Sequence, residues 1–524
     1  MTVHEAQTAD GRTPAKATRR EWIGLAVIAL PCLVYAMDLT VLNLALPAIS
    51  AQLRPTSAQL LWIVDIYGFL VAGFLITMGT LGDRIGRRKL LLAGAAAFGL
   101  ASTVAAFATS AEMLIAMRAA LGIAGATLAP STMSLIRNMF HDEHERQFAI
   151  GVWIASFSVG GAIGPLVGGV LLQFFWWGSV FLVAVPVMLL LLLLGPKLLP
   201  EYRDPNAGRV DLASVVLSLA SVLAVIYALK RFAEDGFAWQ PALLLAAGLI
   251  VGVSFVRRQR RLAYPLLDLR LFAQAKFSAA IAAYALSCLA MFGVYIFITQ
   301  YLQLVLGLTP LAAGIATLPW ALVFVIGSLV APRVARRFAP VSILVWGLAL
   351  TAFGFAMLAF VDGSYPLAVL VAATVVMSAG LAPVFTIGNE MIITAAPPER
   401  AGAASALSET SSEFSGALGI AVFGSLGTVL YRSGLGEALP EGVPLTTAAE
   451  ALATLGGAMA AATALPTQMG DALRAAAAAA FTGALQFNAL AGAAIVLAAS
   501  LAAARILRGA GAVVGPAGRE GAGE

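Results

Sequence analysis

The stretch Gly79-Thr-Leu-Gly82-Asp83-Arg84-Ile-Gly86-Arg87-Arg88-Lys89 places a dense group of charges between two long apolar runs. Each run is long enough for a helix that crosses a bilayer. Glycines permit a tight turn, so the charges end one helix and begin the next within a very short loop. The aspartate can pair with an arginine or accept from a helix N-terminus, so the loop can latch and release as helices shift. The simpler reading is a basic anchor at the membrane surface.

The rest of the chain is just as apolar. Of its 524 residues, 60% are hydrophobic and 11% are charged, whereas soluble domains carry about 25% charged residues. Runs of roughly 20 apolar residues predict an all-α integral membrane fold with fourteen transmembrane helices. The runs lie at 22–48, 59–81, 89–109, 112–137, 146–173, 177–195, 211–229, 241–256, 277–305, 309–332, 340–361, 365–394, 401–430 and 480–505. The eighth run is the shortest and therefore the weakest of these predictions.

The basic residues predict the orientation of the chain. With the N-terminus inside, most of the 32 Lys and Arg residues fall in inward-facing segments, so both ends are predicted to be cytoplasmic and the protein to lie in the cell (inner or plasma) membrane. The inward cluster 257–261 is expected to contact anionic lipid headgroups, not nucleic acid. The basic residues expected on the outside are Arg54, Lys230, Arg231, Arg432 and Arg474.

Several classes of chemistry lack the residues they need. Cys32 and Cys288 lie in apolar runs, which does not indicate a disulfide framework. The three histidines lie outside the apolar runs, and the dipeptide Gly-Lys is absent, so no P-loop is present. The sequence therefore predicts neither an enzyme nor an ATP-driven pump, with no metal and no cofactor.

Two predicted spans carry unusual side chains. The fifth contains Gly160, Gly164, Pro165, Gly168 and Gly169. Small residues four apart let another helix approach closely, and proline bends the helix. Ordinary helix packing would explain the glycines alone.

The fourth predicted span contains Arg118, followed by Gly122 and Gly125. An arginine within a bilayer is costly and needs a partner or a water-filled cavity. The alternative is a structural bond to a backbone carbonyl.

Together these motifs resemble those of the major facilitator superfamily. The 79–89 loop is similar to the superfamily's signature loop, and a degenerate copy at 331–337 follows the tenth span, as internal duplication implies. The glycine–proline string of span five resembles the antiporter motif of drug exporters, and span four resembles the R-x-x-x-G helix, whose arginine is implicated in proton coupling. Fourteen spans, and the first-span segment 37–47, resemble the drug:proton antiporter branch of QacA-, SmvA- and LfrA-like multidrug efflux pumps.

The resemblance implies two six-helix halves with two extra central helices. The implied domains are a cytoplasmic tail (1–21), an N-terminal half (22–195), an inserted pair with linkers (196–276), a C-terminal half (277–505) and a second tail (506–524). The long outward loop at about 431–479 is either a helical hairpin over the outer mouth or a passive linker.

Two acids in the thirteenth predicted span are the first candidates for function. Glu409 and Glu413 are four residues apart and share a helix face with small and polar neighbours. Two nearby carboxylates in a low dielectric cannot both ionise easily, so such a pair can exchange a proton for a cation. The spacing resembles the paired acids of QacA-type exporters. A later start of the span would leave Glu409 at the cytoplasmic edge.

Three further acids lie within predicted spans. Asp38 has no basic residue nearby in sequence, so its partner is a group on another helix, a substrate, water or its neighbours Thr40 and Asn43. Asp65 is either hydrated at the interface or part of a cation site in the outer vestibule. Glu390 lies near the inner end of its span, at the interface or within reach of Arg400 or Glu409.

The function predicted from these residues is proton-coupled antiport, driven by the proton gradient, that exports lipophilic cationic drugs or antiseptics from the cytoplasm or inner leaflet. Its partners would be these small molecules, protons and the lipid bilayer, with no nucleic acid, and the protein would be a monomer. The alternative is export of one endogenous metabolite or a self-made antibiotic. A non-transporting sensor on the same scaffold is a third reading.

Overall fold

A computed structural model describes residues 16–203, 211–235, 238–262, 265, 269–395 and 401–512. All regular elements within these residues are helices, which confirms the predicted all-α class.

The N-terminal part of the bundle contains eight helices that form six membrane-crossing segments. The short helices α4 and α5 form one apolar segment, as do α7 and α8. The bounds are α1 Arg19–Leu53, α2 Ser57–Ile85, α3 Arg87–Ala106, α4 Ala111–Gly125, α5 Leu128–Met139, α6 Glu143–Phe174, α7 Ser179–Leu182 and α8 Ala184–Leu198.

The remaining helices comprise the inserted pair, the C-terminal half and a short hairpin. Those of the inserted pair and the first part of the C-terminal half are α9 Leu212–Asp235, α10 Trp239–Gln259, η1 Leu271–Ala273, α11 Ala275–Gln300, η2 Tyr301–Val305 and α12 Pro310–Val334. Those that follow are α13 Pro340–Met357, η3 Leu358–Phe360, α14 Pro366–Ala395, α15 Ala401–Glu437, α16 Leu445–Ala453, α17 Leu455–Ala462 and α18 Thr467–Ala512.

Fourteen membrane spans result when α6 is taken as one bent span. Thirteen helical segments of the described chain are individually long and apolar enough to cross a bilayer, and α6 adds the fourteenth with a bend of 42° between Gly161 and Ile163. Pro165 explains the bend, because it cannot donate to the carbonyl of Gly161 and its ring crowds that carbonyl. The eighth predicted run, drawn short at 241–256, is a full-length helix of 21 residues.

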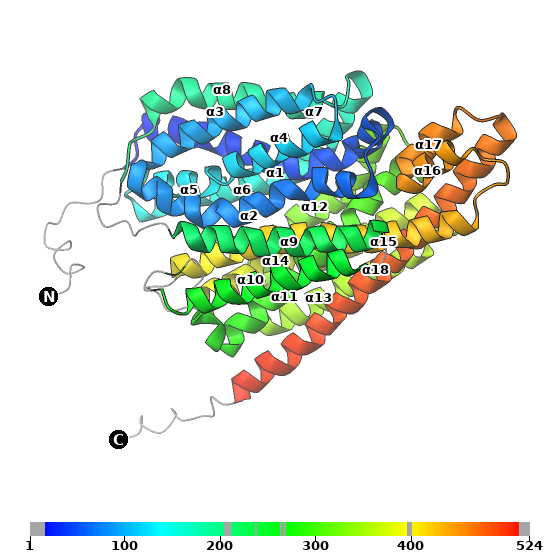
Figure 1. The fold of residues 1–524 in the computed structure, drawn as a ribbon. Coiled ribbons are helices and arrows are strands. Elements are labelled where there is room, and N and C mark those ends of the chain that lie inside the picture. The colour runs from blue at the N-terminus through cyan, green and yellow to red at the C-terminus, as the bar shows by residue number, and fades with distance from the viewer. Residues whose placement is uncertain are drawn as a thin grey trace, which may run out of the picture.

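The two halves meet mainly along two helix pairs, α2 with α15 and α6 with α12. The inserted pair α9–α10 packs on the first of these seams, where α9 touches both α2 and α15 (Figure 1). The start of α1 and the end of α18 lie at the same end of the bundle, which we call the tail end. The opposite end carries α16 and α17, and we call it the hairpin end.

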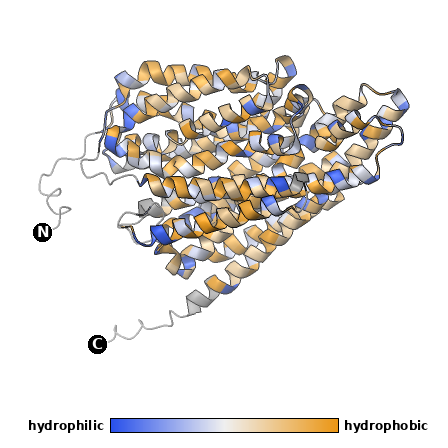
Figure 2. Ribbon diagram, in the orientation of Figure 1, coloured by the Kyte–Doolittle hydropathy of each residue, from blue (hydrophilic) through white to orange (hydrophobic). Residues whose placement is uncertain are grey.

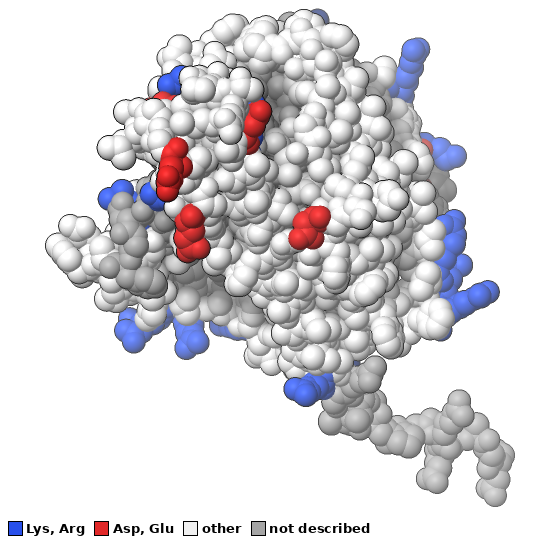
Figure 3. All heavy atoms as spheres, turned by 90° about the vertical axis from the view of Figure 1, so that its right-hand side faces the viewer, with Lys and Arg blue, Asp and Glu red and all other residues white. Residues whose placement is uncertain are grey.

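The surface chemistry follows from this arrangement. Apolar residues dominate the long flanks of the bundle, and hydrophilic residues gather toward the ends of the helices (Figure 2). Viewed onto the hairpin end, acidic side chains lie on a largely uncharged face, and Lys and Arg are seen mainly at its rim (Figure 3). The apolar flanks are those expected of a surface that faces lipid.

The 431–479 segment is helical rather than a passive linker. It contains the end of α15, the α16–α17 hairpin and the start of α18. Arg54 next to α1 pairs with Glu450 at 3.0 Å, and the Ser57 hydroxyl donates to the Ala453 carbonyl. The hairpin thus joins the N-terminal half to the C-terminal half at the hairpin end.

The sequence-based placement of Lys230 is wrong. Lys230 was expected in an outward loop, but it lies within α9 and its side chain is 1% exposed. The apolar run was ended at residue 229 because a charge normally marks a membrane boundary, whereas this lysine is paired inside the protein.

Candidate functional site

Asp38 of α1 is neutralised by Arg118 of α4. An Arg118 guanidinium nitrogen lies 2.5 Å from Asp38 Oδ2, and both side chains are largely buried. The arginine also donates to the Ile63 carbonyl at 3.1 Å and lies 4.5 Å from the centre of the Tyr67 ring. Arg118 is therefore the partner on another helix that was predicted for Asp38. Arg118 also forms the bond to a backbone carbonyl that was the alternative prediction for this arginine. Thr40 does not bind Asp38, since its hydroxyl donates to the Met37 carbonyl.

Asp65 of α2 has a partner of the same kind from the inserted helix α9. Lys230 Nζ lies 2.9 Å from Asp65 Oδ2 and 3.0 Å from Oδ1, and the carboxylate side chain is fully buried. The same ammonium lies 3.7 Å from the centre of the Trp62 ring. Asp65 is thus not a hydrated carboxylate at the interface, as one sequence-based reading had it.

Glu413 of α15 faces these two pairs without an ion-pair partner among the described residues. Its Oε1 accepts a hydrogen bond of 2.9 Å from the hydroxyl of Tyr35, which comes from the opposite half. Glu413, Asp65 and Arg118 line one cavity of about 40 Å³, together with Phe292. This volume holds a few water molecules and no drug-sized compound, so cargo entry requires the halves to move apart.

Glu409 lies one turn from Glu413 on the same helix, nearer the tail end. α15 begins at Ala401, so Glu409 lies about two turns into the helix and Glu413 about three. Glu390 is exposed on α14 and is not among the residues that line the Glu413 cavity. Its proposed partner Arg400 lies outside the described residues.

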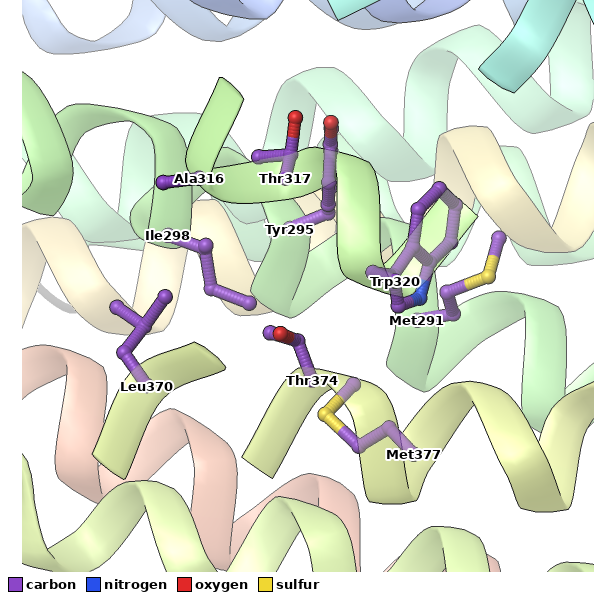
Figure 4. Close-up of a pocket in the computed structure, with 9 residues that line it drawn as sticks. All are labelled: Met291, Tyr295, Ile298, Ala316, Thr317, Trp320, Leu370, Thr374 and Met377. Atoms are coloured by element: carbon purple, nitrogen blue, oxygen red, sulfur yellow. The ribbon is translucent and has the colours of Figure 1, made fainter. Parts of the chain in front are cut away.

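A second hollow lies within the C-terminal half. It measures about 10 Å³, and Figure 4 shows Met291, Tyr295 and Trp320 on its wall. It is apolar, it holds at most one water, and the Tyr295 hydroxyl has no hydrogen-bond partner in the described chain. Carboxylates are absent from its lining, so we assign no cation binding to it.

The glycine–proline string of α6 places that helix against one helix from each half. A Cβ on Gly160 would lie 2.1 Å from the Leu33 carbonyl oxygen of α1. A Cβ on Gly169 would lie 2.8 Å from the Pro310 carbonyl oxygen of α12, and one on Gly314 of α12 would lie 2.5 Å from the Pro165 carbonyl oxygen. A Cβ on Gly164 would meet the Thr40 side chain of α1, and one on Gly168 would lie 2.6 Å from Val41 Cγ2. The string therefore forms part of the seam between the halves.

The charged loop between α2 and α3 is a single residue, Gly86, with a φ of +115° that favours glycine. Arg87 donates to Asp83 at 2.7 Å and to the Pro130 carbonyl at 3.2 Å. The Arg88 backbone N–H donates to Glu201 at 3.1 Å. Arg84 is exposed, Gly82 packs against the Arg87 side chain and Gly79 lies beside Pro130. These contacts tie the loop to α5 and to Glu201, which follows α8.

Comparison with known proteins identifies the family. A family model described as Major Facilitator Superfamily matches residues 28–420. This chain belongs to the major facilitator superfamily. It is 45% identical to the multidrug efflux pump LfrA of Mycolicibacterium smegmatis, over 93% of this chain and 96% of that protein.

Two further relatives and one solved structure are similar at lower identity. The chain is 34% identical to the methyl viologen resistance protein SmvA of Salmonella typhimurium, over 87% of this chain and 92% of that one. It is 31% identical to the tetracenomycin C resistance and export protein of Streptomyces glaucescens, over 84% of this chain and 81% of that one. A crystal structure of a bacterial homologue of the lysosomal transporter Spinster, in an inward-facing and unoccupied conformation, shares the fold with a TM-score of 0.67 and 18% identity, over 94% of this chain and 99% of that chain.

Two residues of the candidate site were not predicted from the sequence to take part in it. Tyr35 and Lys230 both contact candidate acids, from α1 and α9. A tyrosine in an apolar run gives no distinctive signal. Lys230 did give one, a single charge at the end of an inserted apolar run.

Proposed function

We propose that this chain exports lipophilic organic cations in exchange for protons. The observation that carries the proposal is the difference between the acids around the central cavity. Asp38 and Asp65 of the N-terminal half are ion-paired, whereas Glu413 of the C-terminal half has a neutral tyrosine as its described partner. A carboxylate that borders a cavity and lacks a resident cation can accept either a proton or a cationic cargo.

The relatives support the drug class. Proteins similar over most of this chain are named for multidrug efflux, methyl viologen resistance and antibiotic export. Methyl viologen carries two permanent positive charges, which is the kind of compound a cavity with buried carboxylates attracts.

The transport cycle then follows from two facts about Glu413, its position at the cavity and its contact with the other half. The tail end faces the cytoplasm, and cargo reaches the cavity from there or from the inner leaflet of the plasma membrane. Cargo binds the Glu413 carboxylate and displaces its proton, with Glu409 one turn nearer the entrance. The halves rock along their two seams, and a proton from outside neutralises Glu413 and releases the cargo outward.

The test is proton flux in proteoliposomes with an imposed pH gradient. A quaternary ammonium dye should dissipate the gradient with the wild type and far less with Glu413→Gln. Glu409→Gln should reduce the flux, and Asp38→Asn should reduce it through loss of the arginine's partner. Arg474→Gln removes an exposed charge paired with Asp471 and should leave the flux unchanged. If all three acid variants retained wild-type transport of mono- and divalent cations, the site assignment would be wrong.

A second candidate function is export of one antibiotic that the cell itself makes. It is favoured by the similarity to the tetracenomycin C export protein. Growth inhibition of a deletion strain by a broad panel of compounds separates the two functions. Sensitivity to many unrelated cations supports multidrug export, and sensitivity to one compound supports the alternative.

A further inference from the structure

The inserted helix α9 presents a cation to a site that is built for one. Trp62 and Asp65 lie on one face of α2, three residues apart. An aromatic face together with a carboxylate is the combination that binds organic ammonium groups, through cation–π attraction and ion pairing. In this structure the ammonium at that position belongs to the chain itself, to Lys230.

The position of Lys230 is unusual for its helix. Most of α9 faces outward, with only 22% of its apolar window buried. Its inner face packs in a small cluster with α2 and α15, formed around Phe69, Ile226 and Ala417. A lysine in a span is costly unless it is paired, and Lys230 points into this seam with its side chain 1% exposed.

The helix that carries Lys230 is braced at its other end. Arg258 of α10 forms two hydrogen bonds with Asp211, of 2.8 and 2.9 Å, and Gln259 donates to Ser214 at 2.7 Å. The inserted pair is therefore one unit, which holds Lys230 at a fixed depth.

Asp65 connects this ammonium to the cargo cavity. Asp65 lines the same cavity as Glu413 and Arg118, and its carboxylate is ion-paired with Lys230. Of the two acids in the cavity lining, Asp65 is therefore compensated by Lys230, whereas Glu413 has no ion-pair partner among the described residues.

We propose that Trp62 and Asp65 form an ammonium-binding subsite of the cargo cavity, and that Lys230 occupies it as a tethered competitor. The inference rests on the proposed cation export and specifies its selectivity. With Lys230 in place, a second cationic group of the cargo must displace the lysine to reach Asp65. Lys230 thus favours monocations over dications, and a dication that does bind pushes Lys230 out of the subsite.

The test compares two cargo cations of the same shape and different charge. Methyl viologen has two quaternary nitrogens, and N-methyl-4-phenylpyridinium has one. Their dissociation constants are measured by calorimetry on the full-length protein in nanodiscs. Lys230→Gln leaves the Asp65 carboxylate without its ammonium, so we expect the preference for the dication to rise by roughly tenfold.

Three further variants serve as controls. Lys230→Arg keeps a cation beside Asp65 and should keep the wild-type preference. Lys230→Gln combined with Asp65→Asn removes both charges and should cancel the gain. Arg474→Gln removes a positive charge from a surface pair at the hairpin end and should change neither constant. An unchanged preference in Lys230→Gln would mean that Lys230 only fastens α9 to α2, and the proposal would be overturned.

A chemical-modification experiment on the wild-type protein tests the same proposal without depending on whether a variant folds. Lys230 is buried, so a permeable acetylating reagent should modify it slowly. Mass spectrometry should show that saturating methyl viologen raises the acetylation of Lys230 severalfold. The monocation should not raise it, and the acetylation of the reference residue Lys197 should not change with either compound. No effect of methyl viologen on Lys230 would contradict the competition. Failure of the wild type to bind or transport either cation would instead overturn the proposed function.

Discussion

At the scale of single residues, the buried charges of the N-terminal half follow a common pattern. Asp38 has Arg118 next to Tyr67, and Asp65 has Lys230 next to Trp62. Each acid is thus compensated by a cation from another helix that also rests on an aromatic ring of α2. The C-terminal half supplies Glu413 without such a cation in the described chain, which is why we propose that cargo and proton meet there.

The first prediction concerns the energy of the Asp38–Arg118 pair. Arg118→Gln leaves Asp38 buried and unpaired, which should lower the free energy of unfolding by about 3–5 kcal/mol. Asp38→Asn combined with Arg118→Gln should lose less than the sum of the two single changes. Thermal denaturation in detergent measures all three variants.

The control for that cycle is the exposed pair Asp471–Arg474, whose atoms lie 2.8 Å apart. The same double-mutant cycle there should give a coupling of about 0–1 kcal/mol. Additive losses at Asp38 and Arg118 would show that the buried contact is not energetically coupled.

The identities of these candidate acids could be predicted from sequence, but their partners could not. A carboxylate in an apolar run is visible because it is costly there. Which cation compensates it depends on how helices far apart in sequence meet. Asp38 and Arg118 are 80 residues apart, and Lys230 and Asp65 are 165 apart.

At the scale of elements, the close packing of α6 depends on glycines, which have no side chain to clash with the neighbouring helices. Gly160 and its neighbour Gly161 provide a matched pair, because a Cβ at Gly160 meets the Leu33 backbone whereas one at Gly161 meets nothing within 4 Å. The spacing of the small residues predicted a close helix contact, and it did not reveal that α6 contacts both α1 and α12.

The second prediction uses this pair. Gly160→Ala should destabilise the protein by about 1–3 kcal/mol, since backbone atoms cannot move aside. Gly161→Ala should be neutral or slightly stabilising, because alanine favours a helix more than glycine does. Melting temperatures in detergent compare the two. An equal effect of both substitutions would rule out the close α1–α6 contact as the cause.

The third prediction concerns the base of the inserted pair and its pH dependence. The hydrogen bonds from Arg258, with help from Ser214, lower the pKa of Asp211 from 3.8 to about 2. A lowered pKa in the folded state means that the pair stabilises the protein above pH 3.8, and that this contribution is lost as the pH falls through about 2.

The Asp211→Asn variant measures that contribution. The difference in melting temperature between wild type and variant should be constant from pH 7 to 5 and should shrink from pH 4 to 2. A difference that grew on acidification would have the wrong sign for this pair.

At the scale of the whole molecule, the fold was the most predictable feature. Fourteen apolar runs of bilayer length identify fourteen helical membrane spans, because lipid leaves the backbone no other way to satisfy its hydrogen bonds. The 431–479 segment was less predictable, since α16 and α17, of nine and eight residues, are too short to resemble spans. Their arrangement depends on contacts such as that between Gly456 and Ser50.

The fourth prediction tests the orientation of the bundle. Leu445 on the hairpin is 89% exposed, and Arg203 is exposed at the tail end. In intact cells, an impermeant maleimide should label Leu445→Cys but not Arg203→Cys, which should react only after the membrane is opened. The natural Cys32 and Cys288 are buried and should react slowly. Labelling of Arg203→Cys from outside would reverse the proposed direction of transport.

The central claim is that a cation and a proton compete for Glu413, and proton release on binding tests it most directly. Purified protein in weakly buffered detergent, with a pH indicator, is mixed with saturating N-methyl-4-phenylpyridinium. The wild type should release protons as the cation binds, and Glu413→Gln should release about one fewer per molecule. Binding without proton release, or equal release from both proteins, would contradict the account.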